Sequence, residues 1–126
     1  MATINSRNFG TATGRLVKDP VTFTNGDGSK KIVVNLALRD NFKGKDGETG
    51  AQFVDFTAFV PKDAKGDVYS MMHEGDLVSI TYELRNDNYT DSKGVQHFDV
   101  TLRITGVDLL EPKSVTEARL KARAKN

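Results

Sequence analysis

Four aromatic side chains stand outside the apolar faces of the strands that the sequence predicts. Phe53 and Phe59 occupy the polar phase of one strand, Tyr89 shares the phase of Arg85 in another, and Phe42 follows a third. Every nucleic-acid base has a π face, so such rings bind bases without reading their sequence, at roughly 1–3 kcal/mol per base. Because duplex hides its base faces, the pattern predicts a stacking surface for single-stranded nucleic acid.

Basic side chains interleave with these rings and could neutralise phosphates or stack through a guanidinium plane. The residues that we expect to contact the nucleic-acid backbone are Arg15, Lys31, Arg39, Lys43, Arg85 and Lys93. Phe98 is a weaker stacking candidate, because it shares the phase of the apolar residues Val100 and Leu102. The predicted site is an extended groove that needs no metal and no cofactor.

Alternation of apolar and polar residues predicts the strands that position these side chains. It is clear over residues 31–39, 53–60, 78–85 and 97–104, where the even-numbered positions form the expected core, and weaker over residues 9–17. The weaker strand and the four clear ones make five predicted strands. Residues 63–73 lack alternation, and their apolar residues have near-helical spacing, so they predict a helix between the third and the fourth of these strands. This order is typical of the OB-fold, an all-β, five-stranded barrel that commonly carries oligonucleotide sites.

The C-terminal end differs from the rest of the chain in its charge. Residues 1–110 carry 13 basic and 15 acidic groups, whereas residues 111–126 carry 5 basic and 2 acidic groups. Pro112 marks the boundary. We therefore expect one OB-fold domain over residues 1–110, followed by a basic C-terminal appendage over residues 111–126 that forms a short helix or a tail.

The composition excludes several other classes of protein. A net charge of +1 argues against a histone-like polycation, although charge can still gather on one face. The absence of cysteine excludes a disulfide scaffold, a thiolate zinc site and a cysteine nucleophile. His73 and His97 are the only histidines, and they match no metal-ligand spacing. No catalytic constellation remains, so we expect a protein that is not an enzyme.

The N-terminal residues contain no apolar run that resembles a signal peptide. The sequence also contains no apolar stretch approaching the roughly 18 residues of a membrane span. We therefore expect a cytoplasmic protein without a membrane partner.

Two alternatives share the same fold. In the first, Phe53, Phe59 and Tyr89 are buried against a partner chain, and the domain is a protein-interaction module. In the second, the domain binds RNA, because stacking alone does not separate RNA from DNA. A compact aromatic motif of the kind found in RNA-recognition sheets is missing from the sequence, which favours DNA.

Several segments together resemble the bacterial-type single-stranded DNA-binding proteins, a family with the OB-fold. Residues 14–20, GRLVKDP, are similar to the family's G-x-L-x-x-D-P opening. Phe42 and Phe53 fall where the family commonly has tryptophan, and residues 89–91, YTD, resemble its W-T-D segment. Phe59 and Phe98 match further aromatic positions, and the resemblance spans about residues 9–105.

The resemblance implies single-stranded DNA as the partner, roles in DNA replication or recombination, and a homo-oligomer, usually a tetramer. Cellular members of the family typically end in a flexible tail with an acidic tip that recruits replication and repair enzymes. Residues 118–126, ARLKARAKN, are basic instead. We therefore expect a phage, plasmid or conjugative-element member without that tail, for which a dimer or a filament is an alternative assembly.

Overall fold

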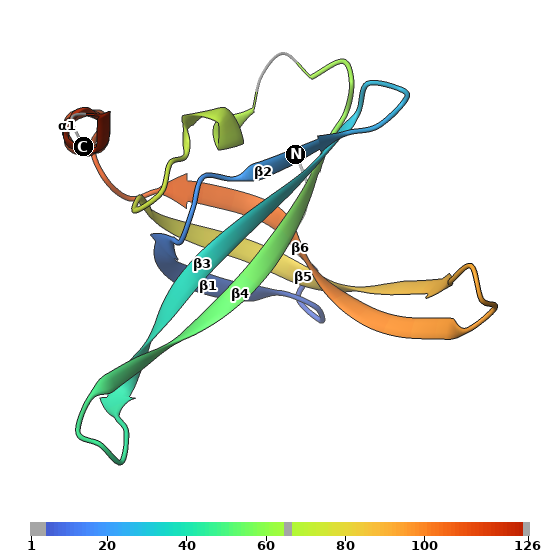
Figure 1. The fold of residues 1–126 in the computed structure, drawn as a ribbon, viewed down its shortest axis with the longest axis horizontal. Coiled ribbons are helices and arrows are strands. Elements are labelled where there is room, and N and C mark those ends of the chain that lie inside the picture. Colours follow the sequence, from blue (N-terminus) through green and yellow to red (C-terminus); the bar gives the residue numbers. More distant parts are fainter. Residues whose placement is uncertain (1–4, 65–66, 125–126) are drawn as a thin grey trace.

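Strands form most of the molecule, and they close into a barrel in the computed structural model, which describes residues 5–64 and 67–124 (Figure 1). The strands are β1 (Gly10–Leu16), β2 (Val21–Thr24), β3 (Lys30–Lys43), β4 (Thr49–Val60), β5 (Leu77–Thr90) and β6 (Gln96–Leu109). Their order is β1-β5-β6-β4-β3-β2, and an additional pairing of β1 with β3 closes the barrel. The predicted all-β barrel of the OB type is confirmed.

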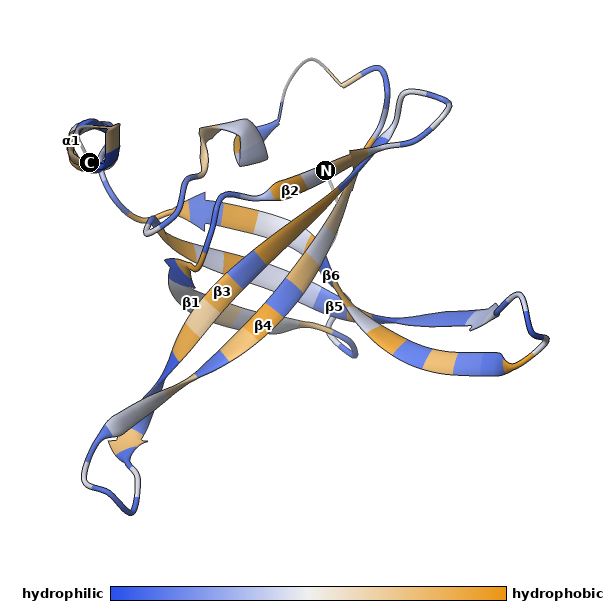
Figure 2. Cartoon of the chain, viewed as in Figure 1, coloured by the Kyte–Doolittle hydropathy of each residue, from blue (hydrophilic) through white to orange (hydrophobic). Residues whose placement is uncertain are grey.

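The core lies on the face of each strand that alternation predicts. Within the barrel, even-numbered residues of β3, β4 and β5 point inward. In β6 the register shift opposite Thr81 and Tyr82 changes the inward phase, so that Val107 packs against the core. The buried apolar side chains are Leu16, Ile32, Val34, Leu36, Phe56, Ala58, Met72, Val78 and Ile80. Phe56 and Tyr82 pack ring against ring across the barrel, with centroids 5.4 Å apart. Banding along β3 and β4 in Figure 2 shows the same alternation of apolar and polar residues.

The weak first strand is confirmed, and a short strand that the sequence does not predict follows it. Residues 9–17 are the predicted strand, and β1 forms within them; after Asp19 and Pro20 the chain also forms β2. Both strands pair with β3, β1 at Leu36 and Ala37 and β2 near the start of β3. The closure needs Gly14, because a Cβ atom there would lie 2.3 Å from the Ala37 carbonyl oxygen. The strand that alternation left weak is therefore the one that bends to close the barrel.

Two hairpins extend beyond the barrel (Figure 1). We call residues 40–50 the β3–β4 arm and residues 84–101 the β5–β6 arm. In the β5–β6 arm the inward alternation of the barrel continues, but no strand in the described part of the chain covers that face. Leu84, Phe98 and Val100 are consequently 50%, 73% and 63% exposed. The prediction that all even-numbered positions belong to the core is therefore wrong for this arm, because its strands outrun the barrel.

The helix predicted over residues 63–73 is much shorter than expected. A single 3₁₀ turn, η1 (Val68–Met71), lies between β4 and β5, and residues 65 and 66 lie outside the described part of the chain. The Asp67 carboxylate accepts a hydrogen bond from the Ser70 amide at 2.8 Å and caps this turn. Tyr69 packs against the core, and its burial, with a smaller effect of Asp67, raises its pKa to about 12.

The C-terminal segment forms the expected basic helix, α1 (Lys113–Ala124), which is held against the barrel by ion pairs. The Arg119 guanidinium lies 2.7 Å from a carboxylate oxygen of Asp76 and 3.0 Å from both carboxylate oxygens of Glu111. Arg123 pairs with Asp19 at 3.0 Å. We call these five residues the docked end. Among the described residues, no helix is long and apolar enough to cross a membrane.

Candidate nucleic-acid interface

The outer face of β3 and β4 carries the predicted stacking residues of the barrel. The register places Lys31 opposite Phe59 and Ala37 opposite Phe53. Both phenylalanine rings are exposed, at 52% for Phe59 and 67% for Phe53. Successive outward side chains on a strand are separated by two residues, or about 6.6 Å. Phe53 and Phe59 therefore lie along one strand at separate positions, with room for several nucleotides between them.

A hollow of about 280 Å³ lies beside Phe59, between β4 and the β5–β6 pair. We call this hollow the central groove. Its lining includes three basic side chains, Lys31, Arg85 and Arg103, together with Thr57 and Thr101 among other residues. The Arg103 guanidinium carbon lies 4.9 Å from the centre of the Phe59 ring, which is a cation–π contact. The groove thus combines an exposed ring with three cations, hydroxyl groups and one carboxylate, that of Asp87.

Arg103 is a groove residue that the sequence reasoning missed. Alternation correctly predicts that Arg103 points outward, because Leu102 and Ile104 flank it, but the nearest aromatic residue in the sequence is Phe98, on the other side of Val100 and Leu102. Its neighbour Phe59 comes from β4, which pairs with β6 in parallel at Thr57 and Arg103. A pairing between strands so distant in sequence gives no local signal.

The end of the β5–β6 arm carries a second aromatic position. Tyr89 lies opposite His97 in the register, and their rings stack with centroids 4.7 Å apart and planes 12° from parallel. The His97 Nε2 atom lies 2.8 Å from a carboxylate oxygen of Asp91. This hydrogen bond, followed by those from the backbone amides of Val95 and Lys93, holds the pKa of Asp91 below its usual value. Asp91 is therefore ionised near neutral pH.

Other predicted contact residues lie apart from the central groove. Phe98 pairs with Asn88, so it lies on the opposite face of the β5–β6 arm from Tyr89. Phe42 and Lys43 end β3 on the β3–β4 arm, where Phe42 is 63% exposed. Lys93 lies in the turn that ends the β5–β6 arm and is exposed.

Arg15 and Arg39 line a further hollow of about 410 Å³ between β1 and the β3–β4 hairpin. Arg39 is exposed there. Arg15, in contrast, donates a hydrogen bond to the Gly75 carbonyl oxygen at 3.0 Å and lies 3.3 Å from Glu111. The Nη1 atom of Arg15 therefore contacts Glu111, a residue of the docked end. The structure thus brings Lys31, Phe59 and Arg85 together and distributes the remaining predicted residues along both arms.

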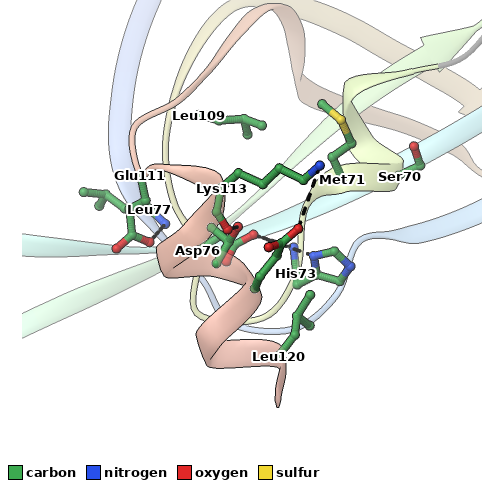
Figure 3. Close-up of a pocket in the computed structure, with 11 residues that line it drawn as sticks. Ser70, Met71, His73, Asp76, Leu77, Leu109, Glu111, Lys113 and Leu120 are labelled. Atoms are coloured by element: carbon green, nitrogen blue, oxygen red, sulfur yellow. Dashed lines mark hydrogen bonds and ion pairs between the residues drawn. The ribbon is translucent and has the colours of Figure 1, made fainter. Parts of the chain in front are cut away.

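A larger hollow, of about 470 Å³, lies beneath α1 (Figure 3). Leu77, Leu109 and Leu120 are among its apolar lining residues, and Lys113 forms an ion pair with Glu117, one turn further along α1, at 3.8 Å. None of the residues predicted to bind nucleic acid lines this hollow. Although this hollow is larger than the central groove, it is therefore not part of the candidate nucleic-acid interface.

Within residues 5–64 and 67–124, no three histidine, cysteine, aspartate or glutamate side chains lie close enough together to hold a metal ion. The chemistry that the described interface offers is stacking, hydrogen bonding and charge neutralisation.

Comparison with known proteins identifies the family of this chain. Residues 8–110 match the model of the single-strand binding protein family. Single-stranded DNA-binding protein 1 of Staphylococcus aureus strain COL is 28% identical over 104 residues, which cover 82% of this chain and 61% of the relative. Single-stranded DNA-binding protein 2 of strain Mu50 is 29% identical over 101 residues, which cover 80% of this chain and 70% of the relative.

The chain thus matches less than two thirds of the length of the strain COL relative. The matched range nevertheless includes all six strands and every predicted contact residue. This protein belongs to the single-strand binding protein family.

Proposed function

We propose that this protein binds single-stranded DNA with little sequence preference. The observation that carries the proposal is the central groove, where the half-exposed ring of Phe59 lies among Lys31, Arg85 and Arg103. Single-stranded DNA offers both an accessible base face and a phosphate for each nucleotide. The names of the Staphylococcus aureus relatives support the same ligand.

In the proposed binding mode, bases stack on the exposed rings while phosphates face the surrounding cations. The rings proposed to stack are Phe42, Phe53, Phe59, Tyr89 and, on the opposite face of its arm, Phe98. The cations proposed to contact phosphates are Arg15, Lys31, Arg39, Lys43, Arg85, Lys93 and Arg103. Since stacking needs only a π face, the site would accept any base, whereas duplex would be excluded because its bases already stack on one another.

We propose that residues 1–110 form the DNA-binding domain and that residues 111–126 act as an appendage that stabilises it. The family match over residues 8–110 supports this division. The ion pairs of Arg119 and Arg123 support a stabilising contact between α1 and the barrel. The expected biological role is protection of single strands during DNA replication, recombination or plasmid transfer.

We further propose that the protein acts as a homo-oligomer. The apolar face of the β5–β6 arm supports this, because Leu84 and Val100 are both at least half exposed. Isolated hairpins are marginally stable in water, so an arm with an uncovered apolar face benefits from a partner. A tetramer, a dimer and a filament are each consistent with this feature, and sedimentation velocity distinguishes among them.

The test of the proposed function is a titration of a labelled oligothymidine, followed by fluorescence anisotropy at several salt concentrations. We expect binding that duplex of equal length does not displace. The affinity should fall with salt, with a slope of about −0.7 for each phosphate neutralised on a single strand. Weak binding, or equal displacement by duplex, would favour the protein-interaction alternative. Equal displacement by oligouridine would favour a less selective site for DNA and RNA.

A further inference from the structure

We propose that His97 is a positioning residue that, with Asp91, holds the ring of Tyr89 in place for base stacking. The inference rests on the proposed function and extends it from the stacking rings to the groups that orient them. His97 is absent from the set of contact residues that the sequence predicts. The geometry at the end of the β5–β6 arm assigns it this role.

The stack between Tyr89 and His97 restricts the tyrosine from one side. Planes only 12° from parallel, with centroids 4.7 Å apart, mean that the imidazole covers one face of the phenol ring. Tyr89 nevertheless remains 49% exposed. One face of its ring is thus supported by His97, and the exposed surface remains accessible to a base. A ring that is already oriented loses less conformational entropy when it binds.

His97 is itself fixed by the turn that ends the arm. One carboxylate oxygen of Asp91 lies 2.8 Å from His97 Nε2, while the other accepts the Lys93 amide at 2.9 Å and the Val95 amide at 3.0 Å. Gly94 closes this turn with a φ of +81°, a conformation that favours glycine. The backbone turn therefore orients Asp91, Asp91 orients His97, and His97 supports Tyr89.

The other exposed rings are supported differently. Phe59 has the Arg103 guanidinium over its ring, at 4.9 Å from the centroid. Within the described part of the chain, neither Phe42 nor Phe53 has a stacked ring or a cation over its face. Among Phe42, Phe53, Phe59 and Tyr89, the ring whose orientation depends on another aromatic side chain is thus Tyr89.

A double-mutant cycle in oligothymidine affinity tests the proposal. The proteins are the wild type, Tyr89→Ala, His97→Ala and the double variant. We expect His97→Ala to weaken binding by roughly three- to tenfold, part of what a stacked base contributes. In the Tyr89→Ala background the same substitution should have almost no further effect. If His97→Ala costs the same factor in both backgrounds, His97 acts without Tyr89 and the proposal is overturned.

Two further variants distinguish loss of the Tyr89–His97 stack from a general disturbance of the β5–β6 arm. His97→Phe keeps a flat ring opposite Tyr89 but loses the hydrogen bond to Asp91, so it should recover part of the affinity that His97→Ala loses. Gln96→Ala is the matched control, because Gln96 is exposed, is the neighbour of His97 in β6 and pairs with Thr90 rather than Tyr89. It should bind like the wild type. A Gln96→Ala loss equal to that of His97→Ala would mean that any change in this strand disturbs the arm, and would overturn the proposal.

The stack can also be observed without DNA. The chain contains only two histidines, so the imidazole signals of His97 are easily assigned by NMR. The Tyr89 ring current should shift the His97 ring protons upfield in the wild type and not in Tyr89→Ala. Absence of the shift would overturn the proposed geometry. A wild type that shows the shift but binds no single-stranded DNA would instead overturn the proposed function, and with it the role of the stack in binding.

Discussion

At the docked end, both arginines of α1 meet carboxylates, whereas across the outer face of the barrel most lysine and arginine side chains face solvent. Arg119 lies within 3.0 Å of Asp76 and Glu111, and the Asp76 side chain is only 5% exposed. In the described structure, Lys31 and Arg39 make no ion pair and are exposed. Charges satisfied within the chain stabilise the fold, while charges left to solvent can serve a ligand.

Apolar groups divide in the same way. At the centre of the barrel Val34, Phe56 and Ile80 are almost completely buried. On the arms and the outer face, large apolar side chains remain half exposed or more, among them Phe53 and Phe98. A monomeric domain gains nothing from exposing such groups. The comparison therefore predicts that substitutions at the docked end change stability and not DNA affinity, and that substitutions on the outer face do the reverse.

The largest expected effect at the docked end is that of Arg119→Ala on stability. This substitution leaves the buried carboxylate of Asp76, and that of Glu111, without their shared guanidinium partner. Breaking such a pair leaves an uncompensated charge, and because Arg119 is partly exposed we expect a loss of about 3 kcal/mol. Urea unfolding followed by circular dichroism measures the loss. Oligothymidine affinity of the folded variant should match that of the wild type.

The matched control is Lys121→Ala on the same helix, since Lys121 is exposed. It should unfold within about 0.5 kcal/mol of the wild type. Equal stability of Arg119→Ala and Lys121→Ala would show that α1 does not stabilise the barrel.

Phe59→Ala should give the largest change in binding. The ring is 52% exposed, so its removal leaves the core intact, but a base loses its stacking partner in the central groove. We expect affinity for oligothymidine to fall by about 2 kcal/mol, or roughly thirtyfold, with little change in urea midpoint. Phe56→Ala, at an inward position of the same strand, should show the opposite behaviour, with a large loss of stability. Normal affinity in Phe59→Ala would remove this ring from the interface.

Arg103→Gln should have a smaller effect on the same groove. It removes the cation over Phe59 and one charge that could face a phosphate. We expect a loss of about 1 kcal/mol in affinity and a weaker dependence on salt, by about one phosphate contact. Anisotropy titrations at several salt concentrations measure both. An unchanged salt slope would show that Arg103 supports the ring without contacting a phosphate.

The contrast between the two regions also explains what the sequence could predict. Alternation is a local property, so it correctly assigned the inward face of β3 and the outward position of Phe53 and Phe59. It could not show that Leu84 and Val100 lie past the end of the barrel, because phase gives the face of a strand and not what covers it. Arg103 and His97 were missed for a related reason. Their partners Phe59 and Tyr89 depend on the register between strands.

The docked end was beyond prediction because its contacts join distant parts of the chain. Arg119 and Asp76 are 43 residues apart, and Arg123 and Asp19 are 104 residues apart. The basic charge of the C-terminal segment was evident, but from sequence alone that charge could equally face DNA, a neighbouring subunit or solvent. The carboxylates that pair with Arg119 and Arg123 lie outside the strands, and the sequence does not distinguish them from the other acidic residues.

The smallest expected effect is a loss of stability in acid, caused by protonation of Glu111 at the docked end. A hydrogen bond from the Leu77 amide, followed by the hydrogen bond and charge of Arg119, holds the pKa of Glu111 below its ordinary value of 4.5. The ionised form is thus favoured in the folded protein. Its stabilising effect is complete above the pKa of the unfolded chain and is lost as the pH falls through the lower folded value. Melting temperature should therefore decrease between pH 5 and pH 3.

Glu111→Gln isolates this contribution, because glutamine keeps the shape of the side chain and does not titrate. The variant should melt at a lower temperature than the wild type at pH 7, since Arg119 and the Leu77 amide lose a charged acceptor. Its melting temperature should then decrease less between pH 5 and pH 3. Asp19, whose pKa is lowered chiefly by its hydrogen bond to Arg123, and Asp91 in the β5–β6 arm still titrate in the variant. An identical decrease in both proteins would therefore place the acid sensitivity at these carboxylates or elsewhere, and not at the Glu111 contact that joins α1 to the barrel.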